Sequence, residues 1–538
     1  MHILLQLIGS AAATLVFYLL TGLIRSRLFS QLSRLPGPKS SDWVFGHLKE
    51  RRASEEPLLF EKWMQEYGRT YKFKSFFGQD RLFTLDSKAL NHVIMHHFIY
   101  QRPEQGRWHL SRILGNGVLV TEGDKHKLQR KVMNPAFGPS QIRDITEIFV
   151  DKAVELREVW LSQVDAAGGT ARINVLQWIS RMTLDVIGRA GFNYEFNSLK
   201  QTGESNELAN AFSVVFGNPE VQATRFGFWT MLQSRFPVLR FLPMKEIPGF
   251  GKARETMNRI AKELLRDSKE ALRASGEKAS SMESKDLLTL LVKSNMSGEP
   301  SQRMSDEDVL AQVPTFLTAG FETTSTATTW ALFGLVQRPD VQQKLREELY
   351  ALQTDTPTMD QLNSLPYLDA VVRETLRFHA PVPLVVRVAA QDDVIPLEHP
   401  VTDKNGVTHS SISVQKGQEV AISILAMNRD KELWGEDATE FKPERWQNGI
   451  PEAASAIPGV WGNMMTFLGG ARACIGYRFA LVEMKALLFI LLKTFTFELA
   501  VPIEDITKRS AIVQRPRLKS EPHASSQLPL LVRAYRKD

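Results

Sequence analysis

Cysteine is nearly absent from this sequence, because Cys474 is the one thiol in 538 residues. A single thiol excludes an internal disulfide, zinc sites built on two or more cysteines, and iron–sulfur clusters. Long basic runs are absent as well, and the formal net charge is only +6. This composition argues against nucleic-acid binding and favours an acidic protein partner or a membrane surface.

Long apolar runs are also scarce, and the clear example stands at the N-terminus. Residues 3–24 carry no charge and are long enough to cross a hydrocarbon core of about 30 Å as a helix. Arg25, Arg27 and Arg34 follow, so the positive-inside rule places the body on the cytosolic side. The alternative is a cleaved secretory signal, which normally has a basic start and a shorter apolar core. We predict a transmembrane anchor over residues 1–24.

The segment after this anchor is basic and contains the turn-forming run LPGP at 35–38. Two prolines and a glycine cannot continue a helix, so residues 25–40 are predicted to form a hinge. Beyond the hinge the sequence shows no second apolar span and no internal repeat. We therefore expect residues 41–538 to form a single domain.

Helical patterns dominate that domain. Residues 305–338 predict a long helix with Ser305 as its N-cap, and Pro314 is expected to kink it or to split off its first turns. Shorter helices are expected over 366–379 and 475–493.

Strand-like alternation is sparser than helical periodicity. It occurs over residues 70–76, 81–86, 382–390 and 418–426. The fold class predicted from these patterns is mainly α with a small β lobe.

Cys474 itself stands between a glycine-rich run and the start of an apolar helix. Gly470 lets the backbone turn tightly, and Gly476 removes a side chain just past the sulfur. The free N–H groups of a helix start favour a thiolate, and Arg472 either stabilises that thiolate or binds an anionic group of a ligand. Three interpretations remain open at this point: an inert buried cysteine, a nucleophile with a positioned histidine, and an axial ligand of a metal macrocycle.

The residues around Cys474 also follow a fixed pattern. It reads Phe467-x-x-Gly470-x-Arg472-x-Cys474-x-Gly476, followed by Phe479, Ala480 and Glu483. This pattern resembles the haem-ligand loop of the cytochrome P450 family, particularly that of fungal microsomal members. The resemblance implies the family's triangular helical body, and haem b with Cys474 as axial ligand to the iron. It also implies that the chain itself binds no flavin or nicotinamide.

The predicted long helix carries AGFETT at 319–324, which is similar to the family's oxygen-activation segment. The resemblance implies that Ala319 and Gly320 lie against the haem. A glycine in a helix interior costs about 1 kcal/mol relative to alanine, so we expect a planar ring or dioxygen to approach Gly320 closely. Glu322 and Thr323 would relay protons to the site where dioxygen is activated. The alternative is an exposed glutamate beside a threonine that bonds back to its own helix.

A third similar segment is Glu374-Thr375-Leu376-Arg377. Residues three apart share a helix face, so Glu374 and Arg377 can pair. In the family the matching pair is buried and completed by a downstream arginine, which here is Arg445 in FKPERW. We expect these three residues to have a structural role, holding the cysteine loop in place.

Haem propionates need cations, and the resemblance supplies several candidates. They are Arg472, Arg387 in VPLVVRVAA, and Arg130 in the run that usually begins with tryptophan four residues earlier. This sequence has His126 at that position instead. A histidine can still donate to a propionate, and the alternative is a solvated histidine on a polar helix face.

The resemblance implies a haem-thiolate monooxygenase that uses O2 and two electrons. The sequence has no convincing dinucleotide-binding fingerprint, so a separate NADPH-cytochrome P450 reductase is the expected partner, with cytochrome b5 as a further candidate. We expect a single-pass protein of the endoplasmic reticulum membrane, with its catalytic domain facing the cytosol and the bilayer as a partner.

The segments that line the pocket in the family have few charges here, which favours a lipophilic substrate. They contain Phe316, Val382, Leu384, Val385 and Ile512. A terpenoid-like substrate of fungal secondary metabolism is favoured, and a sterol or fatty-acid hydroxylase of primary metabolism is the alternative. Two further alternatives are a haem-thiolate isomerase or dehydratase, against which the proton-relay pair argues, and a haem-binding sensor without turnover. Residues 226–244 are expected to dip into the membrane surface or to pack as a buried helix.

Overall fold

The structure is a computed structural model that describes Ser10, Thr14 and residues 30–40, 42–53, 56–200, 206–212, 214, 228–242, 249–275, 286–297, 299, 302–447, 449–510 and 512–536. Apart from Ser10 and Thr14, the anchor predicted over 1–24 lies outside the described residues, as do residues 25–29 of the predicted hinge. Among the helices of the described residues, none combines the length and the apolar character needed to span a bilayer.

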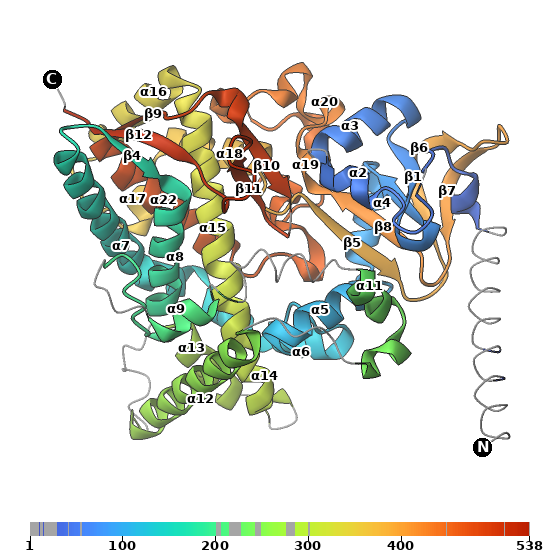
Figure 1. Ribbon diagram of the computed structural model, residues 1–538, viewed down its shortest axis with the longest axis horizontal. Helices are drawn as coiled ribbons and strands as arrows, with labels where there is room; N and C mark the ends of the chain where they lie inside the picture. Colours follow the sequence, from blue (N-terminus) through green and yellow to red (C-terminus); the bar gives the residue numbers. More distant parts are fainter. Residues whose placement is uncertain are drawn as a thin grey trace.

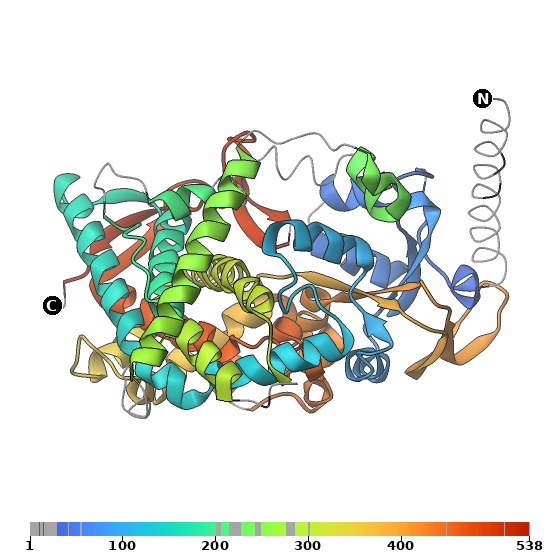
Figure 2. The same ribbon diagram turned by 90° about the horizontal axis from the view of Figure 1, so that it is seen from below.

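Helices form most of the molecule and gather at the end that lies on the left of Figure 1, with α15 running through the middle. Seen from below, α15 is viewed nearly end-on and α12 passes in front of it (Figure 2). The α-helices are α2 Leu48–Ala53, α3 Glu56–Tyr67, α4 Ser87–Met95, α5 Glu104–Leu114, α6 Gly123–Met133, α7 Pro139–Ala166, α8 Val175–Phe192, α9 Glu207–Phe212, α11 Phe228–Arg235, α12 Phe250–Ser275, α13 Leu287–Ser297, α14 Asp306–Leu310, α15 Gln312–Val336, α16 Pro339–Ala351, α17 Met359–Asn363, α18 Pro366–Phe378, α19 Ile424–Asn428, α20 Lys431–Trp434, α21 Glu452–Ser455 and α22 Tyr477–Thr494.

Strands form small sheets, the largest of which lies in the lobe on the right of Figure 1. Within the described residues this sheet has the order β1-β2-β8-β5-β3, and β4-β12-β9, β6-β7 and β10-β11 make up smaller ones. The strands are β1 Thr70–Lys74, β2 Asp80–Thr84, β3 Tyr100–Gln101, β4 Ala171–Asn174, β5 Leu384–Ala389, β6 Asp393–Thr402, β7 Thr408–Val414, β8 Glu419–Ser423, β9 Phe495–Leu499, β10 Ile506–Ser510, β11 Gln514–Leu518 and β12 Pro529–Ala534.

The helix expected over 305–338 is split into α14 and α15 at Ala311. Ser305 caps α14, since its hydroxyl accepts a hydrogen bond from the Asp308 N–H at 3.1 Å. Pro314 lies in the first turn of α15, where a missing N–H costs little because that donor has no helical acceptor. The expected split is thus confirmed.

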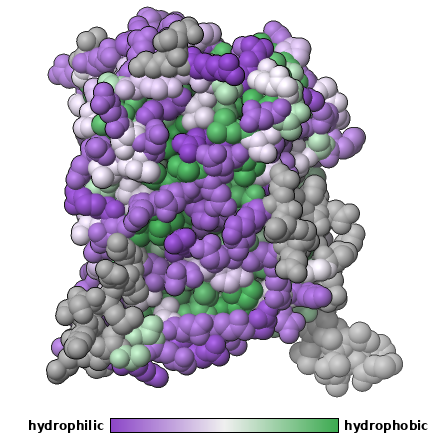
Figure 3. Space-filling model, turned by 90° about the vertical axis from the view of Figure 1, so that its left-hand side faces the viewer, coloured by the Kyte–Doolittle hydropathy of each residue, from purple (hydrophilic) through white to green (hydrophobic). Residues whose placement is uncertain are grey.

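Buried apolar side chains form two clusters that follow these two parts of the molecule. One fills the helical body, chiefly between α7, α8, α15 and α22, and the other lies under the largest sheet and α3 and α4. The surface at the helical end is mainly hydrophilic, with small hydrophobic areas between polar side chains (Figure 3). The mainly α fold with a β-rich lobe is therefore as predicted, and the space between its two parts holds the candidate site.

Candidate active site

The loop before α22 carries Cys474 and is fixed by its own backbone. The Cys474 N–H donates to the carbonyl of Phe467 at 2.8 Å. A Cβ on Gly469 would lie 1.7 Å from the carbonyl oxygen of Pro458, so only glycine fits there. Gly470 adopts φ +63°, in the left-handed region that favours glycine. These glycines shape a tight loop that presents the sulfur at its tip.

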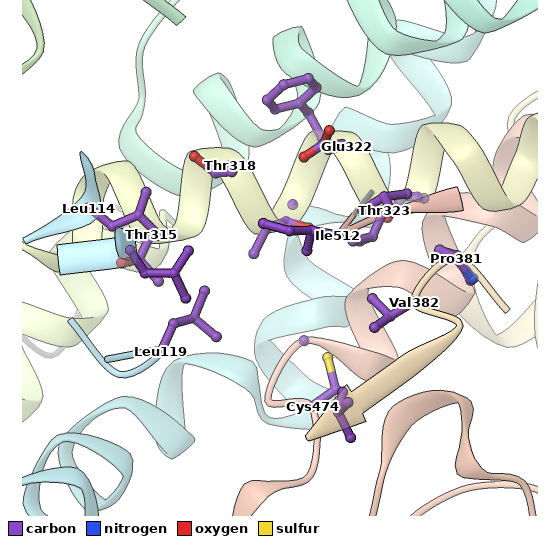
Figure 4. Close-up of a pocket in the computed structure, with 18 of the residues that line it drawn as sticks. Leu114, Leu119, Thr315, Thr318, Glu322, Thr323, Pro381, Val382, Cys474 and Ile512 are labelled. Atoms are coloured by element: carbon purple, nitrogen blue, oxygen red, sulfur yellow. Dashed lines mark hydrogen bonds between the residues drawn. The ribbon is translucent and has the colours of Figure 1, made fainter. Parts of the chain in front are cut away.

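The sulfur faces a cavity of about 1760 Å³. Figure 4 shows Cys474 on one side of this cavity and α15 with Thr323 on the other. Cys474 is reached from the cavity although it lies deep in the protein. Burial raises the pKa of its thiol and outweighs the Gly476 N–H and Arg130, the two groups that favour the thiolate. The expected preference for the thiolate is therefore not found for the free sulfur, and the arginine that acts on it is Arg130 rather than Arg472. A metal ion bound at the sulfur would remove the proton.

Arg130 of the neighbouring helix α6 is hydrogen-bonded to the loop that carries Cys474. Its guanidinium donates to the carbonyl oxygen of Ala473, the residue before Cys474, at 2.8 Å. The contact places a cation beside the ligand loop, and the same arginine lines the cavity.

Three more arginines, Arg102, Arg387 and Arg472, line the cavity near Arg130. Burial, reinforced by the neighbouring Arg102, lowers the pKa of Arg387 and of Arg472 to about 9 each. Burial lowers the pKa of Arg102 to about 10. Among the described residues, Glu122 is the carboxylate paired with Arg472, and it also accepts from the Arg102 backbone N–H at 3.1 Å. The cluster thus has an excess of positive charge that an anionic ligand would balance.

His126 lines the cavity beside these arginines and is only 4% exposed. The alternative of a solvated histidine on a polar face is therefore wrong. Burial, together with Arg102 and Arg130, lowers the pKa of His126 to about 4, so the imidazole is neutral at pH 7.

A haem fits these residues. The accessible sulfur of Cys474 offers an axial ligand, and the excess of guanidinium groups offers partners for two propionates. Arg130, Arg387 and Arg472 were expected from the sequence, whereas Arg102 was not. No pattern marks Arg102 in the sequence, because its neighbours in the cluster come from distant parts of the chain.

On α15, Thr323 and Glu322 point to different sides of the helix. Thr323 lies on the side of Cys474 (Figure 4), and its hydroxyl donates to the Ala319 carbonyl at 2.8 Å. This hydrogen bond from Thr323 to its own helix was expected in the alternative interpretation, in which the segment has no part in proton transfer. Glu322 forms an ion pair with Arg515 of β11. Both α15 side chains line the cavity, so a carboxylate and a hydroxyl border it on this helix.

The structure explains the glycine at position 320 by helix packing, and not by the close approach of a planar ring or dioxygen that we expected. A Cβ on Gly320 would lie 2.8 Å from Cγ1 of Ile187, a residue of α8. Close packing of α15 on α8 therefore explains the glycine, and no planar ligand is needed to account for it. Ala319 and Gly320 still line the cavity.

The Glu374 and Arg377 side chains are both 0% exposed and form two parallel hydrogen bonds of 2.7 and 2.9 Å. Arg445 takes part less than expected. Its Nε lies 3.6 Å from Glu374, while its hydrogen bonds go to Asp437 and to the Trp434 carbonyl. The expected triad is thus a close pair with a more distant third member.

This buried pair is connected to the cysteine loop through Asn428 of α19. Arg377 donates to the Asn428 carbonyl at 2.7 Å. The Asn428 amide in turn donates to the Thr466 hydroxyl at 2.8 Å and accepts from the Met465 N–H at 3.1 Å. The chain of hydrogen bonds links α18 to the segment that begins the ligand loop. Sequence reasoning did not identify Asn428, because no motif surrounds it.

The predicted pocket residues all line the cavity: Phe316, Val382, Leu384, Val385 and Ile512. The expectation of few charges is wrong, however. Arginine and lysine side chains of the lining outnumber its carboxylates, which among the described residues are Glu322 and Glu419. Arg107 and Arg387 belong to segments that were expected to line the pocket, whereas cations such as Arg81 and Arg181 come from segments that the sequence did not assign to it.

Comparison with known proteins agrees with this geometry. The pattern of the family described as Cytochrome P450 matches residues 36–520. The chain is 54% identical over 511 residues to Cytochrome P450 monooxygenase 205 of Postia placenta, covering 94% of this chain and 93% of that protein. It is 51% identical over 513 residues to Cytochrome P450 monooxygenase 128 of the same fungus, again covering 94% and 93%. It is 38% identical over 533 residues to Cytochrome P450 monooxygenase claQ of Ampulloclitocybe clavipes, covering 96% and 97%.

The chain therefore belongs to the cytochrome P450 family, as a monooxygenase whose cofactor is haem b. Bound haem supplies the redox-active iron at which dioxygen is activated. The chain's own residues would then divide the remaining tasks. Cys474 would hold the iron, the arginine cluster would hold the propionates, and the carboxyl of Glu322 and the hydroxyl of Thr323 are the groups at which α15 can hold a proton.

Proposed function

We propose that this protein hydroxylates, or otherwise oxidises, a lipophilic small molecule with O2. The observation that carries the proposal is the cavity itself, in which the Cys474 sulfur lies across from α15 and apolar side chains such as Phe316 and Val382 complete the wall. A cavity of about 1760 Å³ is larger than a typical small-molecule site and would have room for a substrate as well as a haem.

The two electrons come, in this proposal, from a separate NADPH-cytochrome P450 reductase, with cytochrome b5 as a second candidate donor. The absence of a dinucleotide fingerprint from the sequence supports an external donor. The helix α6 supports docking near the ligand loop, because it carries the exposed Lys127 and the loop contact of Arg130. An acidic partner surface would fit that side.

Membrane attachment is the second part of the proposal. Residues 1–24 would form a single-pass anchor in the endoplasmic reticulum, with the catalytic domain on the cytosolic side. Support comes also from the segment around α11, where Trp229 is 41%, Val238 57% and Phe241 91% exposed. Such exposed apolar side chains suit a membrane surface. Fractionation of the full chain and of a chain without residues 1–24 tests this part, since only the full chain should stay with microsomes after an alkaline carbonate wash that removes peripheral proteins.

A role in fungal secondary metabolism, with a terpenoid-like substrate, is the third part. Several similar proteins come from a single fungus, Ampulloclitocybe clavipes, and a family with many members in one organism suits specialised rather than housekeeping chemistry. A sterol or fatty-acid hydroxylase of primary metabolism is the competing function within the same site.

The experiment that tests the central proposal is the carbon monoxide difference spectrum of the reduced, haem-loaded protein. We expect the Soret band characteristic of thiolate ligation, and its loss in Cys474→Ala. Turnover that requires both NADPH and O2 separates a monooxygenase from an isomerase, a dehydratase or a sensor. A histidine-type spectrum, or product formation without either reactant, would contradict the proposal.

A further inference from the structure

The hairpin β10–β11 places two arginines on one wall of the cavity. Arg509 and Arg515 are direct partners in the antiparallel register, so their side chains leave the same face of the hairpin with Cβ atoms about 5 Å apart. Both residues line the cavity. Like charges in this arrangement repel each other, so the hairpin is destabilised unless anions are near.

Only one of the two positive charges is balanced. Arg515 is paired with Glu322 of α15, as described above. Arg509 has neither a hydrogen bond from its side chain nor an ion pair among the described residues. The N–H groups of its guanidinium therefore have no acceptor among the described residues, although the side chain lines the cavity.

The rest of the cavity does not supply the missing anion. The carboxylates of the described lining are Glu322, paired with Arg515, and Glu419, paired with Arg81. Haem propionates would be taken by the arginine cluster near the cysteine loop. Among the described residues, the lining therefore offers no unpaired carboxylate to Arg509, and its guanidinium is available to an anionic ligand.

Apolar residues of the hairpin turn and its surroundings also line the cavity. Ile512, at the turn between the two strands, lines the cavity next to α15 in the view of Figure 4, and Val513 and Val382 add further apolar surface. Ser525 and Ser526, from the segment before β12, also line the cavity. A molecule that bound Arg509 with a charged end would have apolar wall available for the remainder.

We propose that the substrate is a lipophilic carboxylic acid whose carboxylate is bound by Arg509. This inference rests on the proposed function and specifies its substrate. A carboxylate matches the planar fork of a guanidinium with two parallel hydrogen bonds, and its single charge equals that of Arg509, the unbalanced member of the Arg509–Arg515 pair. A phosphate carries more charge than one arginine balances. Binding of the acid at the hairpin fixes one end of the substrate and leaves its apolar skeleton to reach toward Cys474.

The test compares acids with their uncharged esters on the full-length, haem-loaded protein. Isothermal titration calorimetry is run with hexadecanoic acid and methyl hexadecanoate, and with abietic acid and methyl abietate, at pH 7.5. We expect at least one acid to bind about tenfold or more tightly than its ester, the amount typical of a charge-assisted hydrogen bond. Arg509→Gln should remove that difference while ester binding stays the same.

Two variants serve as controls. Arg509→Lys keeps the charge but not the fork, so part of the preference for the acid should remain. Lys519→Gln removes one exposed positive charge just after β11, outside the cavity lining, and should leave the preference unchanged. Haem content and the carbon monoxide spectrum are recorded on the same samples.

Equal binding of acid and ester, absence of binding by both acids, or a preference that survives Arg509→Gln overturns the inference. With thiolate-ligated haem present in the samples, any of these results leaves the proposed function standing. Loss of the thiolate spectrum in the natural protein would instead overturn the proposed function, and calorimetry reports acid binding independently of that spectrum.

Discussion

Glu322 of α15 is joined by an ion pair to Arg515 of β11, and it lies on the opposite side of the helix from Thr323 (Figure 4). A proton-transfer role and a purely structural role make different predictions for this carboxylate. With the first, Glu322→Gln should lower turnover about 100-fold at unchanged haem content, because an amide cannot exchange the proton. With the second, the same variant would lose stability but keep its turnover per haem.

We expect the first outcome, measured as product formed per haem and as NADPH consumed per product. Arg515→Met is the matched control, because it breaks the same ion pair but leaves the carboxyl group in place. Its turnover should stay well above that of Glu322→Gln. Equal losses in the two variants would indicate that the ion pair, rather than proton transfer, is what matters.

The buried pair in α18 gives a stability prediction. Glu374→Gln should cost about 3–5 kcal/mol of folding free energy, because Arg377 would remain buried without its counter-ion. The hydrogen bonds through Asn428 should transmit the damage to the ligand loop, so haem retention falls as well. Thermal unfolding and haem content per chain measure the two effects.

An exposed pair is the control for that prediction. Arg259 and Glu263 form an i,i+4 ion pair in α12 with both side chains largely in solvent. Glu263→Gln should cost no more than about 0.5 kcal/mol. Similar losses in the two variants would show that burial does not set the importance of Glu374.

His126 predicts a dependence of stability on pH. Its folded-state pKa of about 4 lies below the value of 6.5 for a free histidine, so the unfolded chain binds more protons between these values. Stability from this group is therefore fully present above pH 6.5 and is lost as the pH falls toward 4, by about 3 kcal/mol in all. Haem-free His126→Gln should lose less stability than the natural chain over this range, measured by urea unfolding.

The same comparison on haem-loaded protein tests the expected propionate contact. An anion beside His126 raises the pKa of the imidazole, so the difference between the two chains should shrink when haem is bound. An unchanged difference would place the propionates away from His126.

Gly320 and Gly106 form a matched pair of helical glycines. Gly320→Ala should destabilise the protein by about 1–3 kcal/mol, because the new Cβ overlaps Ile187. Gly106→Ala meets nothing within 4 Å and should stabilise α5 by about 0.5–1 kcal/mol. Thermal unfolding of both variants checks the signs, and Ile187→Val should reduce the penalty of Gly320→Ala. Stabilisation by both alanines would contradict the packing account.

Local chemistry explains what the sequence predicted. Ser305 is followed by acidic residues and so starts a helix, and the loop around Cys474 needs particular residues at fixed positions. Contacts between distant segments were less predictable. β11 contains Pro516 and two arginines and does not look like a strand, yet it forms because a two-stranded hairpin tolerates proline. Its ion pair with Glu322 and the cavity position of Arg102 depend on tertiary packing, which no local pattern records.

The solitary sulfur at the base of the cavity also has a practical consequence. A small thiol-selective alkylating reagent that enters the cavity has a single target in the whole chain, and coordination to iron would shield that target. Because burial raises the pKa of the Cys474 thiol, the labelling should be faster in alkaline buffer. The mass increment of the intact protein would then count empty molecules in any preparation directly, without an optical signal.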